Sequence, residues 1–243
     1  SMRMEKEEFF DKIKEKSTKI GLNLSVEQMN KFYNYMNLLI EWNKKINLTA
    51  IIEPEDIILK HFIDSLTIVP YLNSNTTLVD VGTGAGFPGI PVSIVREDIK
   101  ITLVDSLQKR LNFLEEVVSQ LNIKNVKMIH ARAEEFGRNK EYREKYDYAT
   151  SRAVANLSTL SEYLVPLIKV EGKCICMKSS DIEDEKNQAE NAIKKLGGKI
   201  EKIEKFNLPD SDIGRSIIIV SKTSKTPEKY PRKPGIPSKE PLK

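Results

Sequence analysis

A short stretch at residues 78–91, LVDVGTGAGFPGIP, has the residue types and spacing of a ligand-binding turn. Gly82, Gly84 and Gly86 stand at alternate positions after a short apolar run that contains Asp80. Glycines at the end of a strand let the backbone turn sharply, and they let a ligand approach the main chain where a Cβ atom would collide. Nucleotide-binding folds of several chemistries share this pattern, so neighbouring residues must decide which ligand it serves.

Two carboxylates narrow the choice of ligand. Asp105 ends the next apolar run, 23 residues after Gly82, where a carboxylate can accept hydrogen bonds from both hydroxyls of a ribose. That position fits either NAD or S-adenosylmethionine. Asp80 would repel the pyrophosphate of a dinucleotide, whereas S-adenosylmethionine carries a sulfonium and an ammonium that an acid tolerates or favours. The acid–x–Gly–x–Gly–x–Gly order therefore favours S-adenosylmethionine, and the remaining alternatives are NAD and a structural loop without a ligand.

Polar residues also follow the third and fourth apolar runs. Ala133 and Glu134, in HARAEEF, would lie where the third strand-to-helix loop reaches an adenine. Taken alone, Glu134 is equally well explained as an acid at a helix N-terminus. The cluster TSRAVANLS lies at the end of the fourth run, in the crevice where doubly wound sheets place their chemistry.

Motifs that the sequence lacks restrict the kinds of atom that can accept the methyl group. The fourth strand is not followed by the Asn/Asp-Pro-Pro-aromatic turn of enzymes that methylate exocyclic amines. Pyrimidine C5 methylation needs a nucleophilic cysteine, and Cys174 and Cys176 both lie in an apolar run, where they are expected to pack as small hydrophobes. An acceptor that is nucleophilic without a strong base remains. We predict no disulfide and no metal site.

The elements that must position these residues alternate in the manner of an α/β protein. Apolar runs expected to be strands alternate with amphipathic segments such as LQKRLNFLEEVVSQL, which predicts a largely parallel sheet with helices on both faces. The last two strands are joined by a short link and should pair antiparallel, because a parallel crossover needs a dozen or more residues. The expected fold is a Rossmann-like S-adenosylmethionine-dependent methyltransferase fold with seven strands and an N-terminal helical module. The expected strands are TLVDV, KITLVD, VKMIHA, YDYATSR, GKCICMK, KIEKFNLP and RSIIIVSK.

Helices are expected before the sheet, over residues 5–72. Ser25 is a suitable N-cap, and apolar residues then recur at three- and four-residue steps from Met29 to Leu39. A second periodic segment runs from Pro54 to about Pro70. We predict three parts: a helical module at 1–72, an S-adenosylmethionine-binding domain at 73–222, and a basic proline-rich tail at 223–243.

The tail carries the excess charge of the protein. The chain has a formal net charge of +4, and residues 222–243 alone contribute +5. Five prolines and few apolar residues predict an extended segment that builds no core. Two alternatives follow: a disordered tail, or a basic arm that binds RNA phosphates through Lys229, Arg232 and Lys233, with Tyr230 available to stack on a base.

Membrane and secreted classes are not favoured by the sequence. No run approaches the roughly 18 to 20 apolar residues of a membrane span. The first ten residues, SMRMEKEEFF, lack the apolar centre of a signal peptide. We therefore expect a cytoplasmic protein without a membrane partner.

Seven motifs in order resemble one known family. NLTAI, KHFIDSL, DVGTGAGFPGIPVSIV, LVDSLQKR, ARAEEF, SRAVA and GRSIIIVSK are similar to the bacterial RsmG (GidB) family. The resemblance covers about residues 20–243, and the proline-rich tail is similar to that of members from Gram-positive bacteria. It implies methyl transfer from S-adenosylmethionine to guanine N7 in a decoding-region loop of 16S ribosomal RNA. The implied partner is this RNA or the small ribosomal subunit, and no obligate protein partner is evident. Guanine N7 carries an in-plane lone pair, which agrees with the absence of an obvious base.

The resemblance also assigns residues. It implies that Gly82, Phe87, Ala133, Glu134 and Arg152 contact S-adenosylmethionine and that Asp105 holds its ribose. Three strand-end cations are candidates for phosphate or guanine contacts: Arg152, Lys178 and Arg215. His61 shares a helix face with Asp64 and Ser65; it faces the catalytic crevice, where it would help to position the substrate, or it caps the packing between two parts of the fold. His130, in a strand, is expected to be structural.

Other functions remain open at this point. A methyltransferase for a small molecule or a protein is the nearest alternative. A hydride-transferring Rossmann enzyme is disfavoured by Asp80 and by the antiparallel last strand. A non-catalytic S-adenosylmethionine sensor or RNA-binding factor would bind the cofactor tightly without turnover.

Overall fold

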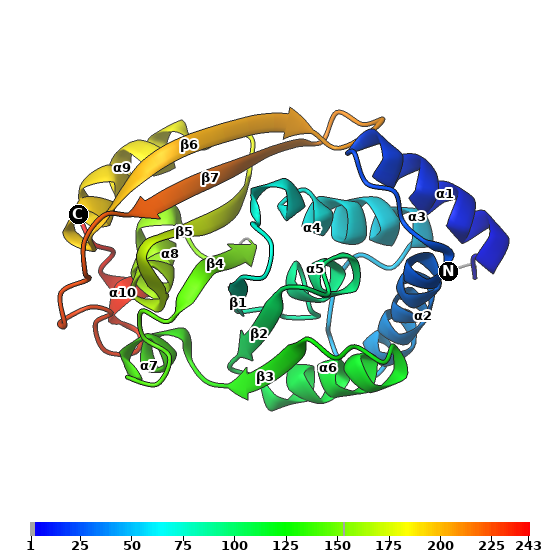
Figure 1. Cartoon of the computed structure of the whole chain (residues 1–243), viewed down its shortest axis with the longest axis horizontal. Helices are drawn as coiled ribbons and strands as arrows, with labels where there is room; N and C mark the ends of the chain where they lie inside the picture. The colour runs from blue at the N-terminus through cyan, green and yellow to red at the C-terminus, as the bar shows by residue number, and fades with distance from the viewer. Residues whose placement is uncertain (1–2, 153) are drawn as a thin grey trace.

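A seven-stranded sheet forms the centre of the molecule in the computed structural model, which describes residues 3–152 and 154–243 (Figure 1). Its strand order is β3-β2-β1-β4-β5-β7-β6. The first five strands pair in parallel, and β7 pairs antiparallel with both β5 and β6. The expected fold class and the antiparallel pairing of the last two strands are confirmed. The strands are β1 (Thr77–Val81), β2 (Lys100–Asp105), β3 (Val126–His130), β4 (Tyr146–Arg152), β5 (Ile168–Ser179), β6 (Gly198–Asn207) and β7 (Gly214–Lys222).

Helices cover both faces of this sheet. On one face, α5 (Gly89–Val95) and α6 (Gln108–Gln120) pack together with the N-terminal helices. On the other face lie α7 (Ala133–Arg138), α8 (Leu157–Leu164), the short 3₁₀ helix η3 (Val165–Leu167) and α9 (Glu183–Lys195). Successive strand residues point to opposite faces, so Leu78 joins the first core and Val79 joins the second. Cys174 and Cys176 are buried in the second core, as expected for small hydrophobes.

The N-terminal helices pack on the sheet rather than apart from it. α1 (Lys6–Lys19) and α2 (Val26–Asn43) lie at the edge of the molecule, and the chain then returns through α3 (Pro54–Asp56). Ser25 caps α2 as predicted, in a capping box with Gln28. Apolar residues of α2, such as Phe32, share one continuous core with the sheet face.

The helix after α3 differs from the prediction in its pitch. Residues Ile57–Ile63 form a π-helix, η1, before the chain continues as α4 (Asp64–Leu66) and a 3₁₀ turn, η2 (Val69–Tyr71). Such wide turns are frequent at functional sites. Here the widened segment holds His61 and leads directly to Asp64, and both polar side chains are buried.

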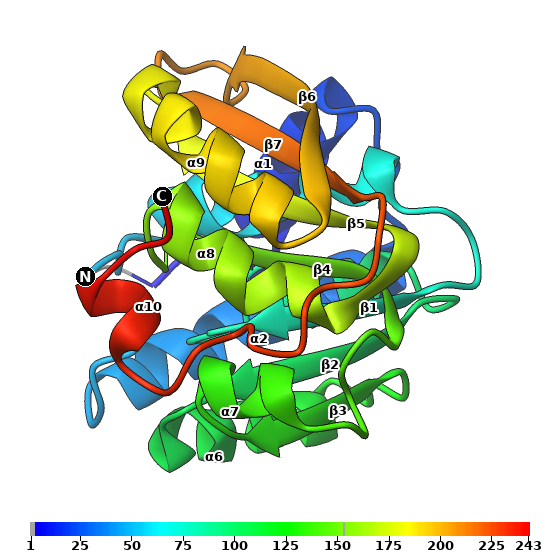
Figure 2. The same ribbon diagram turned by 90° about the vertical axis from the view of Figure 1, so that its left-hand side faces the viewer.

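The C-terminal segment corrects a prediction. Residues 223–243 are neither disordered nor extended away from the body; they fold back along α8 and α7 and include a short helix, α10 (Ile236–Lys239) (Figure 2). Tyr230 is buried in the second core and so is not available to stack on a base. The amino-acid composition led to the wrong prediction, because main-chain hydrogen bonds and one buried ion pair hold the tail in place rather than many apolar side chains.

Within the described residues, none of the helices combines the length and the apolar character that crossing a membrane would require.

Candidate active site

The glycine loop after β1 has the backbone conformation that the sequence predicted. Gly82, Gly84 and Gly86 all have positive φ, at 69°, 60° and 104°, a region that residues with a Cβ atom rarely adopt. The loop is anchored to β2, because the amide N–H groups of Gly82 and Thr83 both donate to the carbonyl oxygen of Val104, at 2.8 and 3.1 Å. A Cβ atom at Gly86 would lie 2.5 Å from the hydroxyl of Tyr35, so this position also excludes larger residues by contact.

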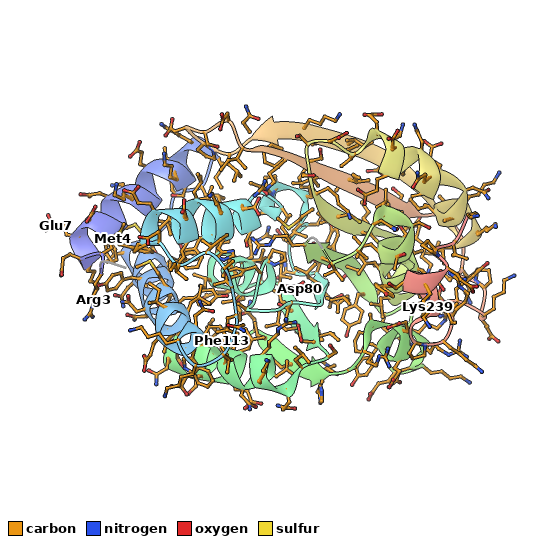
Figure 3. All side chains as sticks on the ribbon, turned by 180° about the vertical axis from the view of Figure 1, so that it is seen from behind. Arg3, Met4, Glu7, Asp80, Phe113 and Lys239 are labelled. Atoms are coloured by element: carbon orange, nitrogen blue, oxygen red, sulfur yellow. The ribbon has the colours of Figure 1, made fainter. Side chains whose placement is uncertain are left out.

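Asp80 is completely buried in the interior, where β1 ends (Figure 3). Its Oδ2 accepts hydrogen bonds from the Thr83 hydroxyl at 2.7 Å and from the Gly89 amide at 2.9 Å. Oδ1 has no hydrogen-bond partner among the described residues. Burial raises the pKa of Asp80 to about 7, although these two hydrogen bonds favour the charged form. The loop thus supplies hydrogen-bond donors to Oδ2 of the carboxyl group, whereas Oδ1 has no donor or cation bound to it among the described residues.

Asp105, the last residue of β2, is tied to the same loop. Its Oδ2 accepts a hydrogen bond from the Gly84 amide at 2.9 Å, and its Oδ1 accepts one from the Leu107 amide at 3.0 Å. Arg110 lies 3.5 Å from Oδ1. Each carboxylate oxygen can accept a further bond, so the side chain is oriented by the protein and still able to hold two hydroxyls.

These groups suit S-adenosylmethionine. An unpartnered buried carboxylate oxygen beside a positive-φ glycine turn matches an ammonium group, and a fixed carboxylate at the end of β2 matches a ribose. The residues predicted from the sequence to hold this cofactor are Asp80, Gly82, Gly84, Gly86, Phe87, Asp105, Ala133, Glu134 and Arg152.

Arg152, at the end of β4, connects the sheet to the N-terminal helices. Its guanidinium donates to the Lys60 carbonyl at 2.9 Å, to Asp64 Oδ2 at 3.2 Å and to His61 Nδ1 at 2.9 Å. The same guanidinium lies 5.1 Å from the ring centre of Phe87, a cation–π distance. One side chain therefore binds the widened helix to the glycine loop.

His61 is held in one neutral form by these contacts. A guanidinium can only donate, so Nδ1 of His61 accepts, and Nε2 carries the proton that it donates to the Thr49 hydroxyl at 2.8 Å. Burial and the Arg152 cation lower the pKa of His61 to about 3. The ring stacks on Phe87, with centres 4.2 Å apart and planes within 5°. These contacts agree with the packing role proposed for His61, and its role in positioning the substrate stays a prediction.

A cleft of about 620 Å³ opens beside this network, at the carboxyl ends of β4 and β5 and the start of β7. Its rim carries the cations Lys60, Arg152, Lys178 and Arg215. The two acids that line it are ion-paired: Asp64 with Arg152 and Arg215, at 3.2 and 3.1 Å, and Glu185 with Lys178 at 2.7 Å. Lys178 also donates to the Ala155 carbonyl. The structure therefore brings together the three strand-end cations that the sequence singled out.

One of the two positions predicted to lie near the adenine, Glu134, contacts the C-terminal segment. Ala133 begins α7, and Glu134 is buried next to it with Oε2 accepting a hydrogen bond from the Gly235 amide at 2.7 Å. His130 bonds through Nε2 to the Ser106 carbonyl at 2.9 Å, which agrees with a structural role.

The three tail cations predicted to bind RNA differ in whether their side chains are paired or exposed. Arg232 is engaged in a 2.8 Å ion pair with Glu162, which corrects the expectation that it reaches out to phosphates. Lys229 and Lys233 are exposed.

Sequence reasoning missed several residues of the site. Tyr35 on α2 donates to the Ala85 carbonyl of the glycine loop at 2.5 Å, and Thr49 fixes the His61 ring. The central role of Asp64, which accepts from two arginines, was also missed. The available signal was a polar residue inside an otherwise apolar helix face, as at Tyr35 and Asp64.

Comparison with known proteins agrees with the motifs. Residues 28–214 match the GidB family model, described as rRNA small subunit methyltransferase G. Ribosomal RNA small subunit methyltransferase G of Clostridium botulinum (strain Loch Maree / Type A3) is 49% identical over 238 residues, which is 97% of this chain and 100% of that protein. The protein of the same name from Acetivibrio thermocellus is 54% identical over 223 residues, which is 91% of this chain and 92% of that protein.

The fold also has a counterpart among solved structures. A SAM-dependent methyltransferase from Aquifex aeolicus superposes with a TM-score of 0.53 at 17% identity, covering 74% of this chain and 97% of that one. This likeness concerns the fold. The family match, together with the geometry of the site, identifies S-adenosylmethionine as the methyl donor. The chain belongs to the family of rRNA small subunit methyltransferase G.

Proposed function

We propose that the protein transfers a methyl group from S-adenosylmethionine to N7 of a guanine in the decoding-region loop of 16S ribosomal RNA, in the cytoplasm. The observation that carries this proposal is that the acids lining the cleft are ion-paired and that the nearby His61 ring is neutral. Both lining acids are ion-paired and His61 is held neutral as a donor to Thr49, so none of these three is free to take a proton. Guanine N7 needs no base, because its lone pair attacks directly and no proton leaves the ring.

The reaction would move one positive charge from the sulfonium of the cofactor to the guanine, and it creates no new charge. The cofactor supplies an electrophilic methyl group on a sulfonium; the carbon–sulfur bond breaks as the bond to N7 forms, and the positive charge passes to the guanine. The paired acids Asp64 and Glu185 offset part of the positive charge of the cleft cations, which limits their repulsion of the charge that develops on the guanine. The acceleration would come mainly from alignment of N7 with the methyl group and from a fixed electrostatic environment.

The cleft cations divide between positioning and RNA contact. Arg152 fixes the helix that carries His61 and Asp64, while Lys60, Lys178 and Arg215 present positive charge along the rim. We assign Lys178 and Arg215 to phosphate or guanine contacts, and the exposed Lys229 and Lys233 to RNA phosphates. We also propose that residues 1–72 form a helical module and that the S-adenosylmethionine-binding domain begins at residue 73.

The deciding experiment is methyl transfer from labelled S-adenosylmethionine to small ribosomal subunits from cells that lack the endogenous activity. We expect label in the RNA and N7-methylguanine at one site when the nucleotide is mapped. Protein-free RNA in a parallel reaction shows whether the assembled subunit is required. Label at another atom or in a protein, or bound cofactor without any transfer, would contradict the proposal.

The neutral His61 gives a separate prediction about pH. Because its pKa lies at about 3, protonation of this ring should not appear in the rate between pH 5.5 and 8.5. We expect single-turnover methylation at saturating cofactor to show no step near pH 6.5, the ordinary range of histidine. Control rates are taken with His130→Gln, which removes the other histidine. A step near pH 6.5 that persists in this variant and disappears in His61→Gln would contradict the assignment, because a step from Asp80, whose pKa is about 7 in the free protein, would remain in both variants.

A further inference from the structure

The C-terminal segment is built into the body of the enzyme along α7 and α8 (Figure 2). Its first anchor is Arg143, whose guanidinium donates to the carbonyl oxygens of Thr226, Pro227 and Tyr230, at 2.9, 3.1 and 2.6 Å. Arg138 donates to the Pro231 carbonyl at 2.9 Å. Pro231 packs so closely on α7 that a Cβ atom at Gly137 would lie 2.9 Å from its ring.

The second anchor is a buried ion pair. Glu162 on α8 has no exposed side-chain surface and accepts from both the guanidinium and the main-chain amide of Arg232, with distances of 2.7 to 3.3 Å. A buried carboxylate needs such partners, because an unpaired charge in the interior is strongly unfavourable. The position of the chain at residue 232 is thereby fixed.

Beyond this anchor, the segment contacts the first turns of α7 and α8, which border the proposed cofactor site. The Gly235 amide donates to Glu134 on the first turn of α7, at 2.7 Å. The Pro237 carbonyl accepts from the Thr159 hydroxyl at 2.9 Å, and the Leu242 carbonyl accepts from Ser158 at 2.5 Å, both on the first turn of α8. These turns follow β3 and β4, whose carboxyl ends face the cofactor crevice.

We propose that residues 233–243 form a wall of the S-adenosylmethionine site on its adenine side, with Glu134 and Gly235 as positioning residues. The Gly235 amide occupies Oε2 of Glu134 and thereby orients Oε1 and the first turn of α7 toward the adenine. The contacts to Ser158 and Thr159 hold the start of α8 in the same arrangement. This inference rests on the proposed placement of the cofactor, and it makes the tail a determinant of cofactor affinity rather than an RNA arm.

The test is a chain that ends at Arg232, which keeps Tyr230 and the Arg232–Glu162 pair but removes the contacts of Gly235, Pro237 and Leu242. We expect the dissociation constant for S-adenosylhomocysteine, measured by calorimetry without RNA, to rise about tenfold. That corresponds to the loss of one or two hydrogen bonds that hold the site. Lys239→Ala, at an exposed position of the same segment, is the matched control and should bind as the intact chain does.

One variant of the full chain keeps the proposal falsifiable if the shortened chain does not fold, and a double change tests the coupling if it does. Thr159→Val in the full chain removes one hydroxyl that holds the segment, and cofactor affinity should fall two- to fivefold with little change in melting temperature. Glu134→Ala combined with the truncation should cost less than the sum of the two single changes, because both act through one contact. Unchanged affinity in Thr159→Val and in the truncated chain, or additive effects, would overturn the proposal. Because no RNA is present, failure of the N7 assignment would leave this result unaffected.

Discussion

Asp80→Asn should strongly weaken cofactor binding and, in the same variant, stabilise the free protein at pH 8. The asparagine oxygen can take the place of Oδ2 and keep the hydrogen bonds from Thr83 and Gly89. Its amide nitrogen then occupies the position of the unpartnered Oδ1. A neutral amide replaces the carboxylate that would meet the ammonium of S-adenosylmethionine, so we expect affinity to fall by at least about 100-fold, the effect of losing a charge-assisted bond of about 3 kcal/mol.

The gain in stability follows from the pKa of Asp80. The folded value of about 7 lies well above the ordinary value of 3.8, so the native state holds the proton more tightly than the unfolded state. Stability from this group is therefore complete below about pH 4 and is lost as the pH rises to 7 and beyond. Roughly three pKa units correspond to about 4 kcal/mol, and the unpaired amide offsets about 1–3 kcal/mol of this. A net gain of about 1–3 kcal/mol is expected at pH 8.

The measurement is urea unfolding of both proteins at pH 5 and pH 8, with calorimetric titration of S-adenosylmethionine. Asp98→Asn is the matched control with the opposite sign, because Arg96 and the Asn75 amide lower the pKa of Asp98. This control should lose stability at pH 8 and keep cofactor binding. An Asp80→Asn variant that binds cofactor normally, or that is less stable than the parent at pH 8, would contradict the assignment.

Arg152→Lys should lower the single-turnover methylation rate by about 100-fold or more. The guanidinium makes three polar contacts, to Lys60, His61 and Asp64, and also lies over Phe87. A lysine ammonium is a compact point charge and cannot reproduce this planar set of donors. Loss of two charge-assisted hydrogen bonds, at about 1.5–3 kcal/mol each, is enough for a factor of this size.

Arg215→Lys is the appropriate comparison for this change. Arg215 makes one contact to Asp64, at 3.1 Å through Nε, which a lysine can replace in part. Its rate should fall less than tenfold. Circular dichroism and melting temperature check that both variants are folded. A rate within a factor of three of the parent for Arg152→Lys would show that the contacts to the widened helix do not position the acceptor.

Local patterns were sufficient to predict the framework of the site. The glycine turn, the carboxylates at the ends of β1 and β2, and the cations at the strand ends all lie within a few residues of an apolar run whose period is visible in the sequence. The cap at Ser25 has the same local character. In an α/β sheet, such local features determine where each side chain points, because parallel strands present their carboxyl ends at one edge.

The parts that were missed depend on contacts between distant segments. Asp64 and Arg215 are 151 residues apart, and Glu134 and Gly235 are 101 residues apart, so neither pair leaves a spacing signal. The π-helix from Ile57 to Ile63 keeps the apolar period of an ordinary helix closely enough that only the buried polar residues mark it. Proline content predicted a tail without a core, whereas hydrogen bonds to its carbonyl groups fold it in place.

The shared core between the N-terminal helices and the sheet has a consequence for synthesis. Phe32 of α2 lies in one continuous apolar cluster with Ile217 and Ile219 of β7, near the other end of the chain. These helices leave the ribosome well before the strands that complete their apolar cover. The nascent chain must therefore carry an incompletely covered helical surface through most of its elongation, a state in which exposed apolar residues favour association. The apolar cover of the N-terminal helices is thus completed only after β7 has left the ribosome.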